Sequence, residues 1–302
     1  MRQQSETGRG VPRRRRGGGL RIWVLLAFIA YGAWYWYSNQ TVDPVTGESV
    51  LIDRSLSAED EKALGLQAYQ QILQQERWVD PDATISREIR NIAERLIAKV
   101  ETVEAALAAE HGMEPTRFSA GFDWEVNVID SDQANAFALP GGKMAVYTGL
   151  VPVARNEDAM AVVMGHEIAH AVLRHGAQRM AQQKLSQIGQ AAGAFSGMDP
   201  QQQQMVMAAM GYGYLLPYAR KHETEADEVG LMLAAAACFD PREAVPLWER
   251  MGQGAGGQAP PEFASTHPSS ETRIARLQSL MPKALEYRAR FCEEGALADA
   301  GR

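Results

Sequence analysis

The chain has 302 residues, of which 46% are hydrophobic and 22% are charged, and its formal net charge is -7. This length allows one large domain or two modest ones, and the composition is typical of a folded protein. The charge is unevenly distributed: residues 1–21 contain seven arginines and a single acid, Glu6, so the rest of the chain is strongly acidic. An acidic body excludes nucleic acid as the main partner.

The first forty residues predict a membrane anchor. Residues 1–19 are polar and rich in Arg and Gly, which indicates a disordered basic cytoplasmic tail. Residues 20–37 are aliphatic and end in a Trp/Tyr cluster, which is typical of a single transmembrane signal anchor with its arginines in the cytoplasm. A cleaved signal peptide is the alternative, although the bulky run Trp34 to Tyr37 is unlike a cleavage site.

Helices are expected to follow a short linker. Turn-forming residues in "VDPVTGES" predict a linker over residues 38–56. Ser57 and Asp60 form a capping box for a helix over 58–77. Apolar residues at helical spacing then predict one longer helix over 84–110.

The middle of the chain predicts a small sheet. Alternating apolar residues indicate a strand over 122–130, and residues 135–151 form two short extended runs around a Pro-Gly-Gly turn. Asn156 is placed to cap the next helix and Gly176 to end it. Further helical patterns cover 177–195, 201–213, 218–237, 241–252 and 269–290, separated at 253–268 by a Gly/Pro loop. The expected fold class is therefore α+β, mainly α.

Residues 205–219 carry no charge and include two glycines and one proline. This stretch is short for a membrane span, so it predicts buried core or a mobile lid over a cleft. A second membrane contact is the alternative.

Two cysteines, Cys238 and Cys292, are the only ones in the chain. They are compatible with one disulfide that closes the C-terminal helices, or with two buried thiols.

The segment "AVVMGHEIAHAVLRHG" contains candidate metal ligands and a candidate catalytic acid or base. His166 and His170 are four residues apart on an expected helix, so their imidazoles can reach one metal ion. Glu167 lies about 100° around the helix from His166, where it can contact a water on that ion. This is the H-E-x-x-H pattern of zinc peptidases, and a buried helix with paired histidines is the alternative.

A catalytic zinc needs a third protein ligand, and "RKHETEADEVG" offers one. Glu223 and Asp227 are four apart and share a helix face. Glu223 can ligate the metal, while Asp227 can hydrogen-bond the far nitrogen of a ligating histidine. Glu225 points elsewhere and is the weaker candidate.

The segments "NAFALPGGKMAVYTGLV", "GHEIAHAVLRH", "ETEAD" and "STHPSSETRI", within residues 122–278, resemble one family. The chain is similar to the gluzincin metallopeptidases that include HtpX and the CAAX prenyl endopeptidases, and especially to their periplasmic BepA-like branch. The resemblance implies a zincin-type catalytic domain over 57–293, followed by a short tail at 294–302. It also implies one Zn²⁺ per chain on His166, His170 and Glu223, with Glu167 as general base and Asp227 as an orienting residue.

The resemblance assigns two further features. It implies an edge strand beside the cleft that holds an extended substrate, formed by Gly142, Lys143, Met144, Ala145 and Val146. It also implies that His267 lies near the metal, where it stabilises an oxyanion or covers the open coordination position. A turn histidine without a role is the alternative.

Three other histidines are not expected to bind metal. His175 is five residues after His170 and faces away, which predicts a surface position or packing behind a ligand. His222 and His111 are expected at the surface.

The predicted function is therefore zinc-dependent metalloendopeptidase, acting on polypeptides of the cell envelope that are misfolded or misassembled. A membrane-tethered chaperone-like or binding protein is the alternative, and a structural protein whose histidines bind nothing is a second. Only residues 20–37 resemble a span, unlike the multi-span members of the family. The expected location is therefore a bacterial inner membrane, single-pass, with a periplasmic catalytic domain, or the periplasm after signal cleavage.

Overall fold

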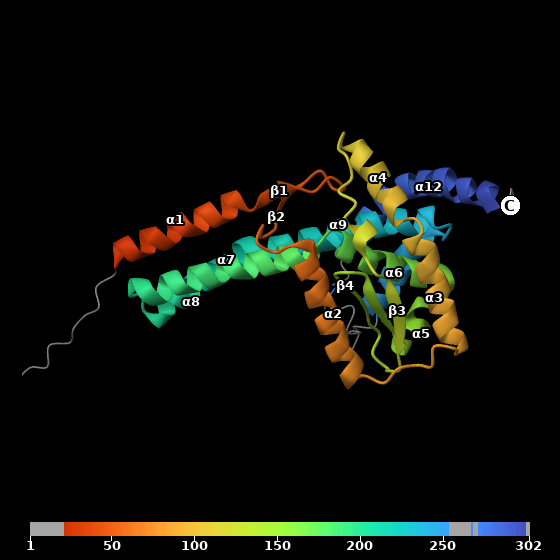
Figure 1. Ribbon diagram of the computed structural model, residues 1–302, viewed down its shortest axis with the longest axis horizontal. Coiled ribbons are helices and arrows are strands. Elements are labelled where there is room, and N and C mark those ends of the chain that lie inside the picture. Colours follow the sequence, from red (N-terminus) through yellow and green to blue (C-terminus); the bar gives the residue numbers. More distant parts are fainter. Residues whose placement is uncertain (1–20, 254–266, 268–270, 300–302) are drawn as a thin grey trace, which may run out of the picture.

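A computed structural model describes residues 21–253, 267 and 271–299. Helices pack around a small sheet to form a body, and a long helical arm projects from it (Figure 1). The mainly helical α+β fold class is confirmed. The predicted tail 1–19 and nearly all of the Gly/Pro loop are outside the described residues.

The sheet in the body has three strands, β3 (Glu125–Ile129), β4 (Ala136–Leu139) and β5 (Lys143–Tyr147), in the order β3-β5-β4. β5 is parallel to β3 and antiparallel to β4. Gly141 and Gly142 both have φ of +88°, which the tight turn between β4 and β5 requires and which favours glycine.

The predicted edge strand is wrong. Gly142 is in the turn, and Lys143, Met144, Ala145 and Val146 belong to the central strand, whose two edges are both paired. Alternation of apolar residues cannot show which strands pair with which. The strand at the end of the sheet after β5 is β4.

Two helices cross at the centre of the body, α6 (Glu157–Val172) and α9 (Leu216–Ala236). Every residue of α6 from Ala159 to Val172 is buried, and the side chain of Asn156 accepts a hydrogen bond from the Ala159 N–H, which confirms the predicted cap. The helix ends before Gly176, because Arg174 takes the left-handed conformation with φ of 56° and Gly176 lies inside the next helix.

Helices α2 (Ala58–Gln75), α3 (Thr84–Ile97), α4 (Val100–Glu110) and α5 (Val151–Ala154) surround the sheet and the crossing. The capping box of Ser57 and Asp60 is confirmed. The single helix predicted over 84–110 is wrong, because the chain bends at Ala98 and Lys99. Neither residue is Gly or Pro, so the sequence contains no signal for this break.

The arm consists of α1 (Ile22–Ser38), α7 (His175–Ser196) and α8 (Pro200–Met210), and a π-helical turn (Gly211–Leu215) leads back into α9. α1 runs along α7, and α8 lies at the far end of α7, away from α6 (Figure 1). No residue of α8 or the π-helical turn is buried, so the prediction of core for residues 205–219 is wrong. Leu216 and Ala219, at the end of this stretch, line a cavity beside Glu223, so the lid stays a prediction.

A helix is present where the anchor was predicted. Across the described part of the chain, however, no helix combines the length and apolar character needed to cross a bilayer.

The predicted linker over residues 38–56 is wrong. It contains an antiparallel hairpin of β1 (Gln40–Val42) and β2 (Ser49–Leu51). Val50 and Leu51 are buried against α7 at the base of the arm, so this segment joins arm and body rigidly.

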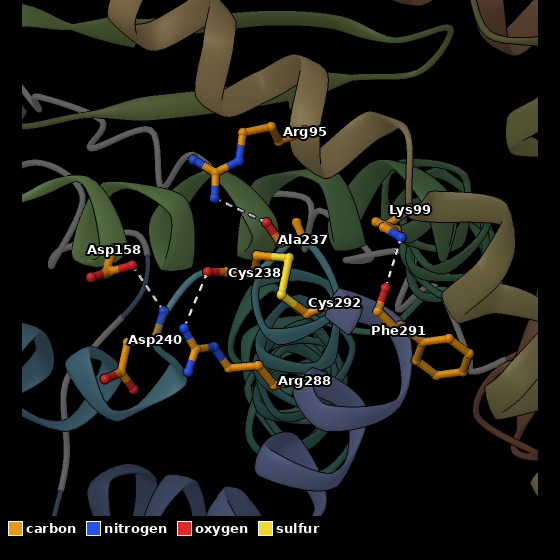
Figure 2. Close-up of a disulfide and its surroundings, with 9 residues drawn as sticks. All are labelled: Arg95, Lys99, Asp158, Ala237, Cys238, Asp240, Arg288, Phe291 and Cys292. Carbon is orange, nitrogen blue, oxygen red and sulfur yellow. Dashed lines mark hydrogen bonds between the residues drawn. A yellow bond between two sulfur atoms is a disulfide. The ribbon is translucent and has the colours of Figure 1, made fainter. Parts of the chain in front are cut away.

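The C-terminal helices are α10 (Ala244–Gln253) and α12 (Glu271–Asp299), and α12 packs along α9. The predicted tail over 294–302 is wrong as far as Asp299, since α12 continues to that residue. Cys238 and Cys292 form a disulfide with 5.0 Å between their Cα atoms, which decides between the two sequence readings. Arg288 donates to the Cys238 carbonyl and Lys99 to that of Phe291, so backbone on both sides of the disulfide is held (Figure 2).

Candidate metal centre

The three motif residues of α6 lie in the interior of the body. His166, Glu167 and His170 are 2%, 4% and 5% exposed. The Nε2 atoms of the two histidines are 3.1 Å apart, as expected for residues one helical turn apart that face the same point. The predicted pairing of these histidines is confirmed.

α9 brings Glu223 to the same point. Its Oε2 is 3.4 Å from Nε2 of His166, and its Oε1 is 3.5 Å from Nε2 of His170. Nδ1 of His267 is 2.6 Å from the same Oε2 of Glu223, so His267 also belongs to the group. One atom from each of His166, His170, Glu223 and His267 lies within 4.8 Å of the others, and this cluster could hold a metal ion.

A close helix contact makes this arrangement possible. A Cβ on Gly165 would lie 2.8 Å from the Gly230 carbonyl oxygen, and a Cβ on Gly230 would lie 2.6 Å from the His166 nitrogen. Only two glycines allow backbones this close. Asp227 and Glu223, one and two turns before Gly230 on α9, thereby reach the histidines.

Asp227 contacts the far nitrogen of the first histidine, while its orienting role stays a prediction. Its Oδ1 is 3.0 Å from Nδ1 of His166 and accepts a hydrogen bond of 2.6 Å from Nη2 of Arg273 on α12. The guanidinium of Arg273 stacks 3.3 Å from the centre of the buried Trp248 ring. Neither Arg273 nor Trp248 was identified from the sequence, because their place depends on how α10 and α12 pack on α9.

The second histidine has its own support. Nδ1 of His175 is 2.7 Å from Nδ1 of His170, and Nε2 of His175 is 3.3 Å from Oε2 of Glu225. The alternative of packing behind a ligand is thus confirmed for His175, which is fully buried. Glu225 supports the site through His175.

His222 was predicted at the surface, and this is wrong. It is 3% exposed, stacks on His175 with 4.2 Å between ring centres, and contacts the Gln178 side chain at 3.0 Å. α7 covers this part of α9, which the local sequence does not reveal. His111 is exposed, as predicted.

Burial and charge act against each other in the site. Burial alone would lower the pKa of His166, but contacts with Asp227 and Glu223 outweigh it and raise that pKa to about 9. Burial lowers the pKa of His170 and raises that of Glu167. For Glu223, burial is outweighed by bonds with His166 and His267, which lower its pKa, so Glu223 is a carboxylate at neutral pH.

Two imidazoles and one carboxylate form the donor set of a catalytic zinc site, and they converge here with buried nitrogens and oxygens. Oε1 of Glu167 is buried beside them without a hydrogen-bond partner among the described residues. A buried carboxylate oxygen of this kind is free to accept a hydrogen bond from a water molecule at the cluster. The residues present therefore fit a zinc ion.

These features define a metallopeptidase of the H-E-x-x-H class. Residues 94–281 match Peptidase family M48, and the chain belongs to this family. It is a zinc metalloendopeptidase, and the predicted family, cofactor and enzyme class are confirmed.

Three relatives show how far the similarity extends. The mitochondrial metalloendopeptidase OMA1 of Schizosaccharomyces pombe is 35% identical over 267 residues, which cover 87% of this chain and 72% of the relative. The protein of that name from Saccharomyces cerevisiae is 32% identical, covering 83% and 72%. The beta-barrel assembly-enhancing protease of Escherichia coli is 31% identical over 158 residues, covering 49% and 32%.

The predicted location is contradicted by this comparison. The relatives that match most of the chain are named as mitochondrial enzymes, which is at odds with a bacterial inner membrane and a periplasmic catalytic domain. The resemblance to the periplasmic branch covers about half of the chain, whereas the similarity to the mitochondrial enzymes covers most of it.

Proposed function

We propose that the chain hydrolyses internal peptide bonds of partly unfolded polypeptides, with His166, His170 and Glu223 as zinc ligands and Glu167 as general base. The unpartnered Oε1 of Glu167 carries this proposal. It is buried at the cluster, 3.5 Å from Nε2 of His267.

When bound, zinc supplies a Lewis acid that activates water and polarises the scissile carbonyl. Glu167 accepts the proton of the attacking water and delivers it to the leaving amine. Burial raises its pKa toward the working pH, which suits both halves of this transfer. His267, whose ring is 3.5 Å from Glu167 and 2.6 Å from Glu223, donates a hydrogen bond to the developing oxyanion.

Substrate backbone has a place beside β4. The Ala138 backbone N–H bonds the Glu167 carboxylate, so β4 passes directly along the catalytic residues. β4 pairs only with β5 among the described strands, and its other edge offers backbone groups to an extended peptide. Such binding uses main-chain hydrogen bonds and therefore tolerates many sequences.

The experiment compares bound zinc and peptide cleavage in the wild-type chain and in Glu167→Gln. We expect about one zinc per chain in both proteins and a loss of cleavage of about 100-fold or more in the variant. Glu223→Gln should lose zinc as well. Cleavage that survives in Glu167→Gln would refute the assignment of the base, and zinc binding without cleavage in either protein would favour the chaperone-like alternative.

We also propose that the arm holds the enzyme on a lipid surface. Apart from Asp199, residues 185–219 carry no charge, and neither does α1. Large apolar side chains nevertheless point outward, among them Trp23 at 84%, Phe195 at 63% and Met205 at 60% exposure. Charges resume only at the base, where Lys184 pairs with Asp53 at 2.6 Å.

Lipid accounts for both the exposed apolar surface and the aromatic side chains Trp34, Trp36 and Tyr37 near that base. The chain should sediment with anionic vesicles. Exchanging Trp23, Phe195 and Met205 together for Ser should release it, whereas exchanging the exposed Leu285 of α12 for Ser should not. Sedimentation of both variants alike would refute the role of the arm.

A further inference from the structure

A cavity of about 870 Å³ adjoins the metal cluster. α7, α9 and α12 contribute its walls, and Glu223 and Asp227 are part of them. Its lining contains Arg179, Arg220, Arg273 and Arg276, and we call it the arginine pocket. Because Glu223 belongs to the metal cluster, anything bound in the pocket lies next to the reacting bond.

The pocket is positive within an acidic chain. Four arginines face two carboxylates, and both carboxylates are engaged: Glu223 with the histidines and Asp227 with His166 and Arg273. A bound zinc ion adds further positive charge. The chain as a whole has a formal charge of -7, so this concentration of arginine is not a reflection of composition.

The four arginines differ in what they contact. Arg273 is buried and bonded to Asp227, and Arg276 pairs with Glu228 at 3.0 Å. The guanidinium groups of Arg179 on α7 and Arg220 on α9 form no ion pair and no hydrogen bond with another described residue, although the Arg220 carbonyl accepts a hydrogen bond from the Thr224 hydroxyl. Both are exposed to the pocket mouth.

We propose that Arg179 and Arg220 form a subsite for a substrate carboxylate, so that the enzyme favours peptide bonds next to an acidic residue. This inference rests on the proposed peptidase function. A guanidinium is weakly hydrated and presents paired N–H groups that match the two oxygens of a carboxylate. Leu216 and Ala219, also in the lining, provide apolar contact for the methylene groups of a Glu side chain.

A carboxylate can come from an acidic side chain or from the end of a polypeptide. The first source leaves the enzyme an endopeptidase with a local preference, and the second directs cleavage to chain ends. The open pocket mouth, with two arginines on facing helices, favours the side chain as the source.

The test uses the full-length, zinc-loaded chain and matched quenched-fluorescence peptides with Glu or Gln at each position around the cleaved bond. At one position, we expect kcat/KM to be about fivefold higher for Glu than for Gln. In the double variant Arg179→Gln with Arg220→Gln, this ratio should fall to about one. Arg77→Gln, which removes an exposed arginine outside the pocket, should keep the wild-type ratio. Raising the salt concentration should reduce the ratio, because the two arginines are exposed.

Free and amidated forms of a peptide that ends near the cleaved bond distinguish the two sources. A preference that appears only with the free terminus, equal cleavage of Glu and Gln peptides, or a ratio that survives in the double variant would each overturn the subsite. None of these outcomes touches the peptidase assignment.

If the wild-type chain cleaves no peptide, the peptidase proposal fails but the subsite is still tested. Binding of the same labelled peptides to zinc-loaded Glu167→Gln is then measured by fluorescence anisotropy. The Glu peptide must bind more tightly than the Gln peptide, and adding the two arginine substitutions must remove the difference. Equal binding would overturn the subsite.

Discussion

Gly165 and Gly230 touch where α6 crosses α9, and this contact sets the spacing of the metal cluster. A methyl group on Gly230 would come within 2.6 Å of the His166 nitrogen. The helices can separate only by moving Glu223 away from His166 and His170. The geometry of the zinc site therefore depends on two residues that have no side chain.

Gly230→Ala should weaken zinc binding without removing any ligand. The added methyl group forces the helices apart, and a buried overpacked contact of this kind costs about 1–3 kcal/mol of stability. Zinc affinity is measured by competition with a chelating dye, and stability by urea unfolding. Gly213→Ala is the matched control, since a Cβ there meets nothing within 4 Å. If Gly230→Ala binds zinc as tightly as the wild type, the geometry of the zinc site does not depend on this glycine contact.

His175→Gln and Glu225→Gln should both lower zinc affinity. His170 uses Nε2 in the cluster, so its Nδ1 donates to Nδ1 of His175, and Nε2 of His175 then donates to Glu225. Loss of such an orienting partner typically costs about 10–100-fold in metal affinity. His111→Gln, at an exposed histidine, serves as control. If zinc affinity changes in the control as much as in the two variants, the orienting role is wrong.

The stability of the fold should decrease between acidic and neutral pH because of Glu104. Burial raises its pKa to about 7, although Ser119 donates a hydrogen bond to it. The unfolded value is about 4.3, so the folded state binds the proton more tightly. This contribution to stability is complete below the unfolded pKa and is lost as the pH rises to the folded pKa.

Glu104→Gln should remove roughly 2–3 kcal/mol of this pH dependence between pH 4.5 and 8. The free energy of unfolding is measured by urea titration at several pH values for the wild type and the variant. Glu101→Gln changes an exposed acid on the same helix and provides the comparison. Parallel pH curves for the wild type and Glu104→Gln would show that this residue is not responsible.

Loss of the disulfide should destabilise the body. Cys238 and Cys292 are 54 residues apart in sequence, and closing a loop of that size contributes about 4 kcal/mol in the chain-entropy account. Unfolding of the oxidised chain is compared with that of Cys238→Ala combined with Cys292→Ala. Similar midpoints would show that the bond adds nothing to stability.

The grouping of the candidate site residues was predictable because the relevant geometry is local. His166, Glu167 and His170 lie within two helical turns, and a helix alone fixes their relative directions. Glu223 and Asp227 are likewise one turn apart. The sequence therefore identified both halves of the site, and the order of motifs identified the family.

The predictions that were wrong concern contacts between segments that are distant in the sequence. β5 is central because β3, which ends before β4 begins, pairs with it from the other side. His222 is buried by α7, and Arg273 reaches Asp227 from a helix that begins after the catalytic helices end. The hairpin at 40–51 is rich in turn residues, yet two of its side chains fill space beside α7. None of these contacts leaves a periodic signal in the residues involved.

α9 and α12 are joined by ion pairs of Asp227 with Arg273 beside the cluster and of Glu228 with Arg276 and Lys283 further along, and the disulfide of Cys238 and Cys292 ties the residues just after α9 to α12. Because the links lie at both ends of the contact, α9 and α12 cannot slide or pivot against each other. A link at one end alone would leave a hinge. The contact of Asp227 with His166 is therefore held along the length of α12, and a pull on α12 beyond Cys292 meets the disulfide before it reaches the metal cluster.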